Sequence, residues 1–110
     1  MEPVITISHY ETPIHLVEQY GGWKSRELIC FFEKYCRTLF NRYKDLVKYW
    51  MTFNEINNVH TIPFAAGAIR HDSNLQDKFQ AAHNMFVASS RANSCVMKLF
   101  QMQRLVVCCH

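Results

Sequence analysis

Hydrophobic residues along the chain form short β-branched runs that alternate with longer stretches of helical spacing. Val4 to Ser8 is a β-branched run that leads directly into His9, which predicts a buried strand ending in a polar loop. From Lys24 to about Leu46, apolar residues recur three or four positions apart, which predicts an amphipathic helix. Ser25 is the expected N-cap of this helix because its hydroxyl can accept a bond from a free backbone N–H.

The second half of the chain repeats this order. We expect a strand at about Lys48 to Asn54, a long functional loop from Asn57 to about Asn74, and a helix from Leu75 to about Ser94. Two strands joined through a helix run parallel and cross over with a right hand. The sequence therefore predicts a small α/β unit with parallel strands.

Composition and charge narrow the classes of function. The chain has 110 residues, and its formal net charge of +3 comes from Lys and Arg that are scattered among acidic residues. We therefore expect no nucleic-acid partner. No apolar run approaches the roughly 20 residues of a membrane span, and the first residues lack the pattern of a secretory signal. The five cysteines form no CxxC pair, which favours reduced thiols, and no histidine has the spacing of a metal ligand.

The residues that follow the second predicted strand are the strongest candidates for chemistry. This strand ends in an amide and a carboxylate, Asn54 and Glu55. In α/β barrels, reacting groups lie at the carboxyl ends of the strands. A solvated glutamate beside a turn-forming asparagine is the alternative interpretation, and spacing alone favours that alternative.

Two segments carry a resemblance to a known family. Thr52-Phe53-Asn54-Glu55 resembles the Thr-Phe/Leu-Asn-Glu signature of glycoside hydrolase family 1, the retaining β-glycosidases. The continuation Ile56-Asn57-Asn58 is similar to the 6-phospho-β-glucosidase branch, because plain β-glucosidases usually have Pro and Trp there. The segment from Thr6 to Pro13 resembles the family's third strand, where Thr-Leu-x-His-Trp-Asp-x-Pro is usual.

The resemblance implies a fold and roles for three residues. The fold is a partial (β/α)8 TIM barrel of about two βα units, strands three and four with their helices, since a whole barrel needs about 250 residues. Glu55 would be the catalytic acid/base, Asn54 would bind the sugar 2-hydroxyl, and His9 would bind another hydroxyl of the same sugar. The family's nucleophile lies in a Glu-Asn-Gly motif that this sequence lacks, so the isolated chain is expected to be inactive.

The implied substrate is a phosphorylated β-glucoside that is hydrolysed in the cytoplasm, without a cofactor or a metal. A plain β-glucosidase or β-galactosidase is the alternative within enzymes. From another class, the chain could be a small helical interaction protein that docks through Phe31, Phe32 and Tyr35. The sequence assigns no oligomeric state.

The sequence also departs from the family in several places. Tyr10 and Glu11 stand where Trp and Asp are commoner, and Asn84 stands where His is expected after Gln80 to His83. The glycines of Tyr20-Gly21-Gly22-Trp23 are expected to form a turn. Because the expected two-stranded sheet leaves one face and both edges uncovered, we expect the piece to fold poorly alone.

The resemblance extends to about residue 95, which divides the chain into a barrel segment, residues 1–95, and a tail, residues 96–110. One choice of synonymous codons for the tail, translated from the third base, gives His-Glu-Ile-Ile-Pro-Asp-Ala-Lys-Ile-Gly-Cys-Leu-Leu-Pro. This is the kind of sequence that the family has after such a helix. We therefore expect the tail to be the product of a frameshift.

Overall fold

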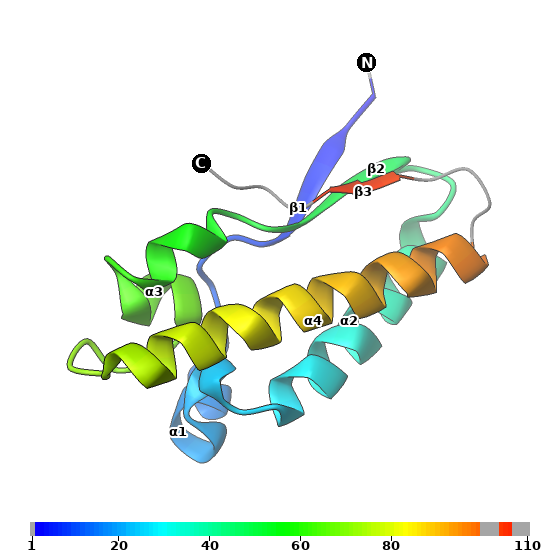
Figure 1. Ribbon diagram of the computed structural model, residues 1–110. Coiled ribbons are helices and arrows are strands. Elements are labelled where there is room, and N and C mark those ends of the chain that lie inside the picture. The colour runs from blue at the N-terminus through cyan, green and yellow to red at the C-terminus, as the bar shows by residue number, and fades with distance from the viewer. Residues whose placement is uncertain (1, 100–103, 107–110) are drawn as a thin grey trace.

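The computed structural model describes residues 2–99 and 104–106, and these residues form a layer of parallel strands beside a layer of helices (Figure 1). In chain order the elements are β1 (Val4–Ser8), α1 (Ile14–Tyr20), a short 3-10 helix (Gly22–Lys24), α2 (Glu27–Tyr43), β2 (Tyr49–Phe53), a second 3-10 helix (Ile56–Val59), α3 (Pro63–Gly67), α4 (Leu75–Leu99) and β3 (Arg104–Val106).

The sheet is parallel, with the order β1-β2-β3. Val4 lies opposite Tyr49 and Ser8 opposite Phe53, and the Asn54 backbone N–H continues the ladder by donating to the Ser8 carbonyl at 2.9 Å. The predicted strand, helix and parallel strand are therefore confirmed. β3 was not predicted, and it places a third strand on the other side of β2.

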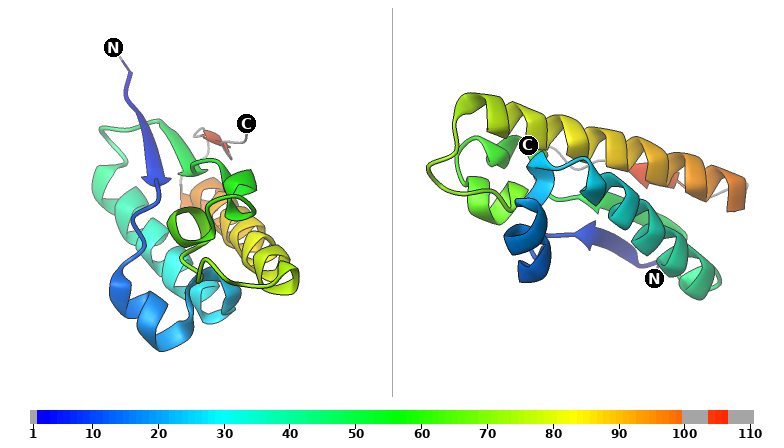
Figure 2. Two further views of the ribbon diagram at one scale, coloured as in Figure 1. Left: turned by 90° about the vertical axis from the view of Figure 1, so that its left-hand side faces the viewer. Right: turned by 90° about the horizontal axis from the view of Figure 1, so that it is seen from below.

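Helices α2 and α4 lie side by side against the central strand, as the views in Figure 2 show. From α2, Phe40 packs edge-on against Trp50 of β2, with the ring centroids 5.2 Å apart. From α4, the buried Ser89 hydroxyl lies 2.8 Å from that of Thr52 in β2. Both helices thus fix the same strand, and the core lies between them and the sheet.

Strand β1 is less buried than the sequence predicts. The exposed fractions of Val4 and Ile5 are 58% and 40%, whereas Ile7 is buried. The prediction of a buried strand was wrong because β1 is an edge strand, paired only with β2 within the described residues. Tyr49, paired with Val4, is also 43% exposed.

The predicted helix boundaries were only partly right. Helix α2 begins at Glu27, and Arg26 takes the N-cap position that was assigned to Ser25. The Ser25 hydroxyl still accepts a long bond, 3.4 Å, from the Glu27 backbone N–H. The region predicted as one long loop contains a 3-10 helix and α3, because Pro63 can occupy the first turn of a helix.

The tail expectation falls largely outside the described residues, which omit 100–103 and 107–110. Residues 96–99 belong to α4, which ends at Leu99, five residues after its predicted end at about Ser94. Residues 104–106 form β3. The boundary at residue 95 and the frameshift origin of the tail remain predictions.

Asn84 ties α4 to the segment before α2. Its side chain is fully buried, and its amide donates to the Trp23 backbone carbonyl at 2.8 Å. Trp23 in turn packs edge-on against Phe53, with the ring centroids 5.1 Å apart. The asparagine that stands in place of the expected histidine therefore satisfies a buried backbone carbonyl.

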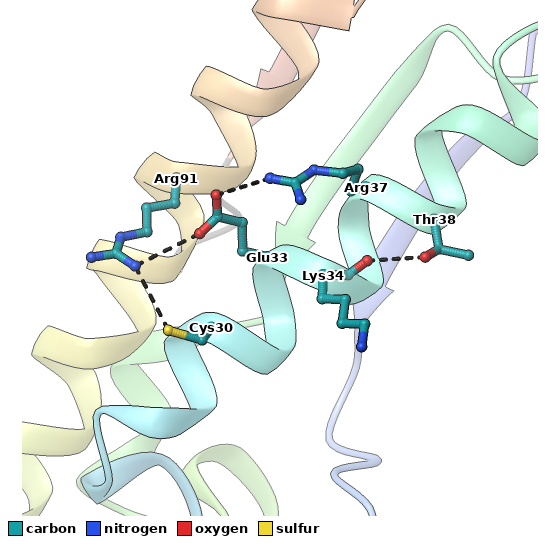
Figure 3. A network of polar contacts seen from close by, with 6 residues as sticks. All are labelled: Cys30, Glu33, Lys34, Arg37, Thr38 and Arg91. Carbon is teal, nitrogen blue, oxygen red and sulfur yellow. Dashed lines mark hydrogen bonds and ion pairs between the residues drawn. The ribbon is translucent and has the colours of Figure 1, made fainter.

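A polar network also joins α2 and α4 at the surface (Figure 3). Glu33 on α2 lies 3.4 Å from Arg37 of the same helix and 3.6 Å from Arg91 on α4. The Arg91 guanidinium also approaches the Cys30 sulfur at 4.0 Å. Because these groups are partly exposed, we expect the network to contribute under about 1 kcal/mol.

The glycine pair between α1 and α2 gives a stability test. Both glycines have left-handed backbone, but a Cβ at Gly22 would lie 1.8 Å from the Ala68 carbonyl oxygen, whereas one at Gly21 would meet only the flexible end of Lys24. We expect Gly21→Ala to cost about 1–2 kcal/mol for the backbone and Gly22→Ala to cost considerably more. Urea unfolding followed by tryptophan fluorescence would measure both, and equal costs would contradict the close approach of Ala68.

The three described cysteines should differ in reactivity. Cys30 is exposed, while Cys36 and Cys95 are buried thiols. Burial raises the pKa of Cys36, and Cys95 and Glu33 add to the effect. In mildly alkaline buffer, iodoacetamide should modify Cys30 in the native chain and reach Cys36 and Cys95 only in urea, because the native fold buries the sulfur atoms of the last two. Peptide mass mapping would measure the rates, and similar rates for all three would contradict the packing of α2 on α4.

Candidate active site

The candidate site lies where β1 and β2 end side by side. His9 and Tyr10 follow β1, and Asn54 and Glu55 follow β2. Because the two strands are parallel and in register, their carboxyl ends meet at the same edge of the sheet. Sequence positions 45 residues apart thereby become neighbours in space.

Both strands leave this edge through left-handed backbone. The φ angles of Tyr10 and Glu55 are 70° and 47°. Residues other than glycine rarely adopt this conformation, and it costs about 1–2 kcal/mol for each residue. Strain of this kind is concentrated at functional sites, where the surrounding structure holds it in place.

A triangle of polar groups surrounds the Glu55 carboxylate. The Tyr10 hydroxyl donates to Glu55 Oε2 at 2.7 Å, and the Asn58 side-chain amide donates to the same oxygen at 2.7 Å. Asn58 Nδ2 also lies 3.0 Å from the Tyr10 oxygen. All three side chains are half-buried, so these bonds are partly shielded from water.

The Tyr10 phenol titrates above its ordinary range. Partial burial is the largest cause of its raised pKa, and the hydrogen bond and negative charge of Glu55 raise the pKa further. The amides of Asn58 and Asn54 act in the opposite direction, because they favour the phenolate. Tyr10 therefore remains a hydrogen-bond donor to Glu55 well into the alkaline range.

The three residues predicted from the sequence occupy different places in this site. Glu55 is at its centre, and Asn54 lies next to it, close enough for its amide to influence Tyr10. His9 is exposed and packs edge-on against the Tyr10 ring, with the centroids 5.5 Å apart. Its backbone N–H donates to the Glu11 carboxylate.

Sequence reasoning missed Tyr10 and Asn58 as members of the site. Tyr10 was noted only as a departure from the commoner tryptophan, and Asn58 only as part of a subfamily signature. A usable signal was the position of Asn58, three residues after Glu55, because one turn of helix brings such residues to the same side. That turn is the 3-10 helix Ile56–Val59.

The arrangement suits proton transfer by a single carboxyl group. Among the described residues, no group of three or more His, Cys, Asp or Glu side chains could hold a metal ion.

An apolar cavity of about 390 Å³ lies elsewhere, between the end of β1, α1 and α2, and Glu55 does not line it. Phe32, proposed above as part of a docking face, is instead a core residue that stacks on Phe53.

The family is shown by sequence comparison. The model of glycosyl hydrolase family 1 matches residues 1–108. This parallel α/β chain therefore belongs to glycosyl hydrolase family 1.

Named relatives refine the comparison within the family. The chain is 54% identical over 95 residues to the Aryl-phospho-beta-D-glucosidase BglH of Bacillus subtilis and 50% identical over 95 residues to a 6-phospho-beta-glucosidase of Clostridium longisporum. Each alignment covers 84% of this chain and 20% of the relative. The chain thus spans about a fifth of the length of these relatives.

Solved structures agree with the sequence relatives. A family 1 β-glucosidase from Thermotoga maritima matches 97% of this chain with a TM-score of 0.84 at 30% identity. A β-glucosidase from Exiguobacterium marinum matches the same share with a TM-score of 0.82 at 25% identity. The chain covers 24% of each of these structures.

Across residues 2–99 and 104–106, no helix has both the length and the apolar character that crossing a membrane requires.

The titration of Tyr10 tests the geometry of the site. Subtracting the ultraviolet pH titration of Tyr10→Phe from that of the 110-residue chain isolates this phenol. Its midpoint should lie above the ordinary value of 10.0. It should fall in Glu55→Gln, because the carboxylate raises the pKa, and it should rise in Asn58→Ala, because that amide lowers the pKa.

The exposed Tyr49 provides the control. Tyr49→Phe should leave the Tyr10 midpoint unchanged. An identical midpoint in the wild-type chain and in Glu55→Gln would show that the contact between Tyr10 and Glu55 is absent.

Proposed function

We propose that the intact protein is a cytoplasmic 6-phospho-β-glucosidase that cleaves phosphorylated β-glucosides into glucose 6-phosphate and an aglycon. The observation that carries this proposal is the site at the ends of β1 and β2, with Glu55 at its centre, in a chain whose 54% and 50% identical relatives bear phospho-glucosidase names. Because the chain spans only a fifth of those relatives, the activity belongs to the intact protein.

In this proposal Glu55 is the catalytic acid/base of a retaining mechanism. It would protonate the departing glycosidic oxygen and later take a proton from the water that releases the sugar. The second carboxyl group, the nucleophile, would lie about 5–5.5 Å away. It would come from a later strand, since this sequence contains no Glu-Asn-Gly motif.

Asn54 and His9 would hold the sugar beside Glu55. Asn54 would donate to the sugar 2-hydroxyl, an interaction that strengthens in the transition state. Its backbone bond to Ser8 and its place next to Glu55 support this role. The exposed imidazole of His9 would bind another hydroxyl from the end of the neighbouring strand.

The proposed architecture is about a quarter of a (β/α)8 barrel, with β1 and β2 as strands three and four. The parallel register, the helices on one face and the site at the carboxyl ends support this proposal. The rest of the barrel would supply the nucleophile and the phosphate-binding loop. The isolated chain should therefore not hydrolyse glycosides.

The preference for a phosphorylated substrate rests on finer features. Ile56-Asn57 stands in place of the Pro-Trp that usually follows the acid/base in plain β-glucosidases. The two phospho-glucosidases above are closer in sequence to this chain than the Thermotoga β-glucosidase is, at 54% and 50% against 30% identity. Cytoplasmic location follows because such substrates arise inside bacteria during phosphorylating sugar uptake.

A segment graft tests the proposal. Residues 2–95 would replace the aligned segment of the BglH enzyme of Bacillus subtilis, so that the host supplies the rest of the barrel. The graft should hydrolyse an aryl 6-phospho-β-glucoside, and Glu55→Gln should lower its rate about 100- to 10,000-fold, the usual contribution of general acid–base catalysis. The exposed Glu18 on α1 gives the matched control, Glu18→Gln, which should leave the rate unchanged.

A folded Glu55→Gln graft with the rate of its parent would overturn the role of Glu55. The same segment can also be placed in the Thermotoga β-glucosidase and assayed with an aryl β-glucoside. That graft should recover a much smaller share of its host's activity than the BglH graft does, because the residues of the segment are adapted to the phospho-specific branch. Equal recovery of activity in both hosts would favour a plain β-glucosidase.

A further inference from the structure

We propose that Tyr10 and Asn58 form a positioning pair that holds the Glu55 carboxyl group in the orientation needed for proton transfer to the glycosidic oxygen. This inference rests on the proposed function, because the role of Glu55 as acid/base comes from there. Neither residue was a candidate in the sequence, and both contact the carboxylate directly.

The first support is that both donors converge on one oxygen. Tyr10 and Asn58 each lie 2.7 Å from Glu55 Oε2, which is an ordinary distance for the phenol O–H bond and the short end of the range for the amide N–H bond. A glutamate side chain has three rotatable bonds, and two donors on a single oxygen restrict all three. Fixing Oε2 confines Oε1 to a narrow set of positions, which is what a positioned general acid requires.

The second support is that the donors reinforce each other. Asn58 Nδ2 is 3.0 Å from the Tyr10 oxygen, so the amide polarises the same hydroxyl that donates to Glu55. Linked hydrogen bonds of this kind strengthen one another where water is partly excluded. Loss of either residue should therefore weaken the bond made by the other.

The third support is that Asn58 is rigidly placed. Its backbone N–H donates to the Glu55 carbonyl at 2.9 Å, and its own carbonyl accepts from Ile62 at 2.8 Å. Its neighbours in the same turn, Ile56 and Val59, are 1% and 2% exposed and anchor the turn in the core. The amide is thus held by the scaffold and does not depend on substrate for its position.

The fourth support is the backbone of Tyr10 itself. Its left-handed φ of 70° is unfavourable for a tyrosine, and it occurs at the residue whose hydroxyl reaches Glu55. A contact that served only to close a loop could be made by a residue in relaxed backbone. Here the strain accompanies a contact with the proposed acid.

The decisive experiment compares leaving groups in the BglH graft. A nitrophenolate departs with little protonation, whereas a weakly acidic alkylphenol needs the proton from the acid. Tyr10→Phe and Asn58→Ala should each lower kcat/KM at least about tenfold for the alkylphenyl 6-phospho-β-glucoside, within the range of acid catalysis. The kcat/KM for the nitrophenyl substrate should fall much less in both variants. Tyr35→Phe and Asn93→Ala, both at exposed positions on helices, are the matched controls.

Tyr10 and Asn58 act on one oxygen of Glu55. The fold loss of kcat/KM for the alkylphenyl substrate in the double variant should therefore be smaller than the product of the two single-variant losses. Equal losses for both substrates, together with a lower Tm, would show that the pair is only structural. Unchanged rates for both variants would also overturn the inference.

The outcomes separate this inference from the proposed function. If Glu55→Gln has no effect on the alkylphenyl substrate, the function itself is wrong. If Glu55→Gln removes activity while Tyr10→Phe and Asn58→Ala act equally on both substrates, only the positioning role is wrong. Should the Tyr10 variant fail to fold in the graft, Asn58→Ala alone still decides, because it removes the other donor to the same Glu55 oxygen.

Discussion

Backbone pairing between β1 and β2 sets Val4 opposite Tyr49 and Ser8 opposite Phe53, and the Asn54 N–H adds one more bond to the Ser8 carbonyl. Everything at the site depends on this register. A shift by one residue would turn every side chain of one strand to the other face of the sheet. Tyr10 and Glu55 could then no longer meet, because each leaves its strand only two residues after the last paired position.

The helices hold this register from one side only. Phe40 of α2 packs on Trp50, and Ser89 of α4 bonds to Thr52, so both helices act on the central strand. Asn84 then fixes α4 to the backbone of Trp23, ahead of α2. The site is therefore positioned from behind by the helices, while the opposite, more exposed side of the sheet carries Val4 and Tyr49.

Sequence patterns predicted the elements that depend on local periodicity. The β-branched run gave β1, the three-and-four spacing gave α2, and the parallel pairing followed from their order. The exposure of Val4 could not be predicted in this way, because it depends on where β1 lies in the sheet. The N-cap was misplaced because the choice between Ser25 and Arg26 depends on how the preceding turn enters the helix.

The candidate site was predicted only in part, because local patterns in the sequence do not show contacts between distant positions. Glu55 and Asn54 could be found because they share one motif at one strand end. The role of Tyr10 depends on a contact across 45 residues, which neither periodicity nor local propensity encodes. Asn58 became visible only once the turn after Glu55 was seen to be helical.

The left-handed backbone of Glu55 sets fold stability against chemistry at a single position. At a φ of 47°, glycine or asparagine would suit the backbone better than glutamate. Either substitution would relieve strain and at the same time remove the carboxylate. Natural drift that is no longer constrained by catalysis would therefore move position 55 toward these residues, and a glutamate there is the choice that protein stability alone would not make.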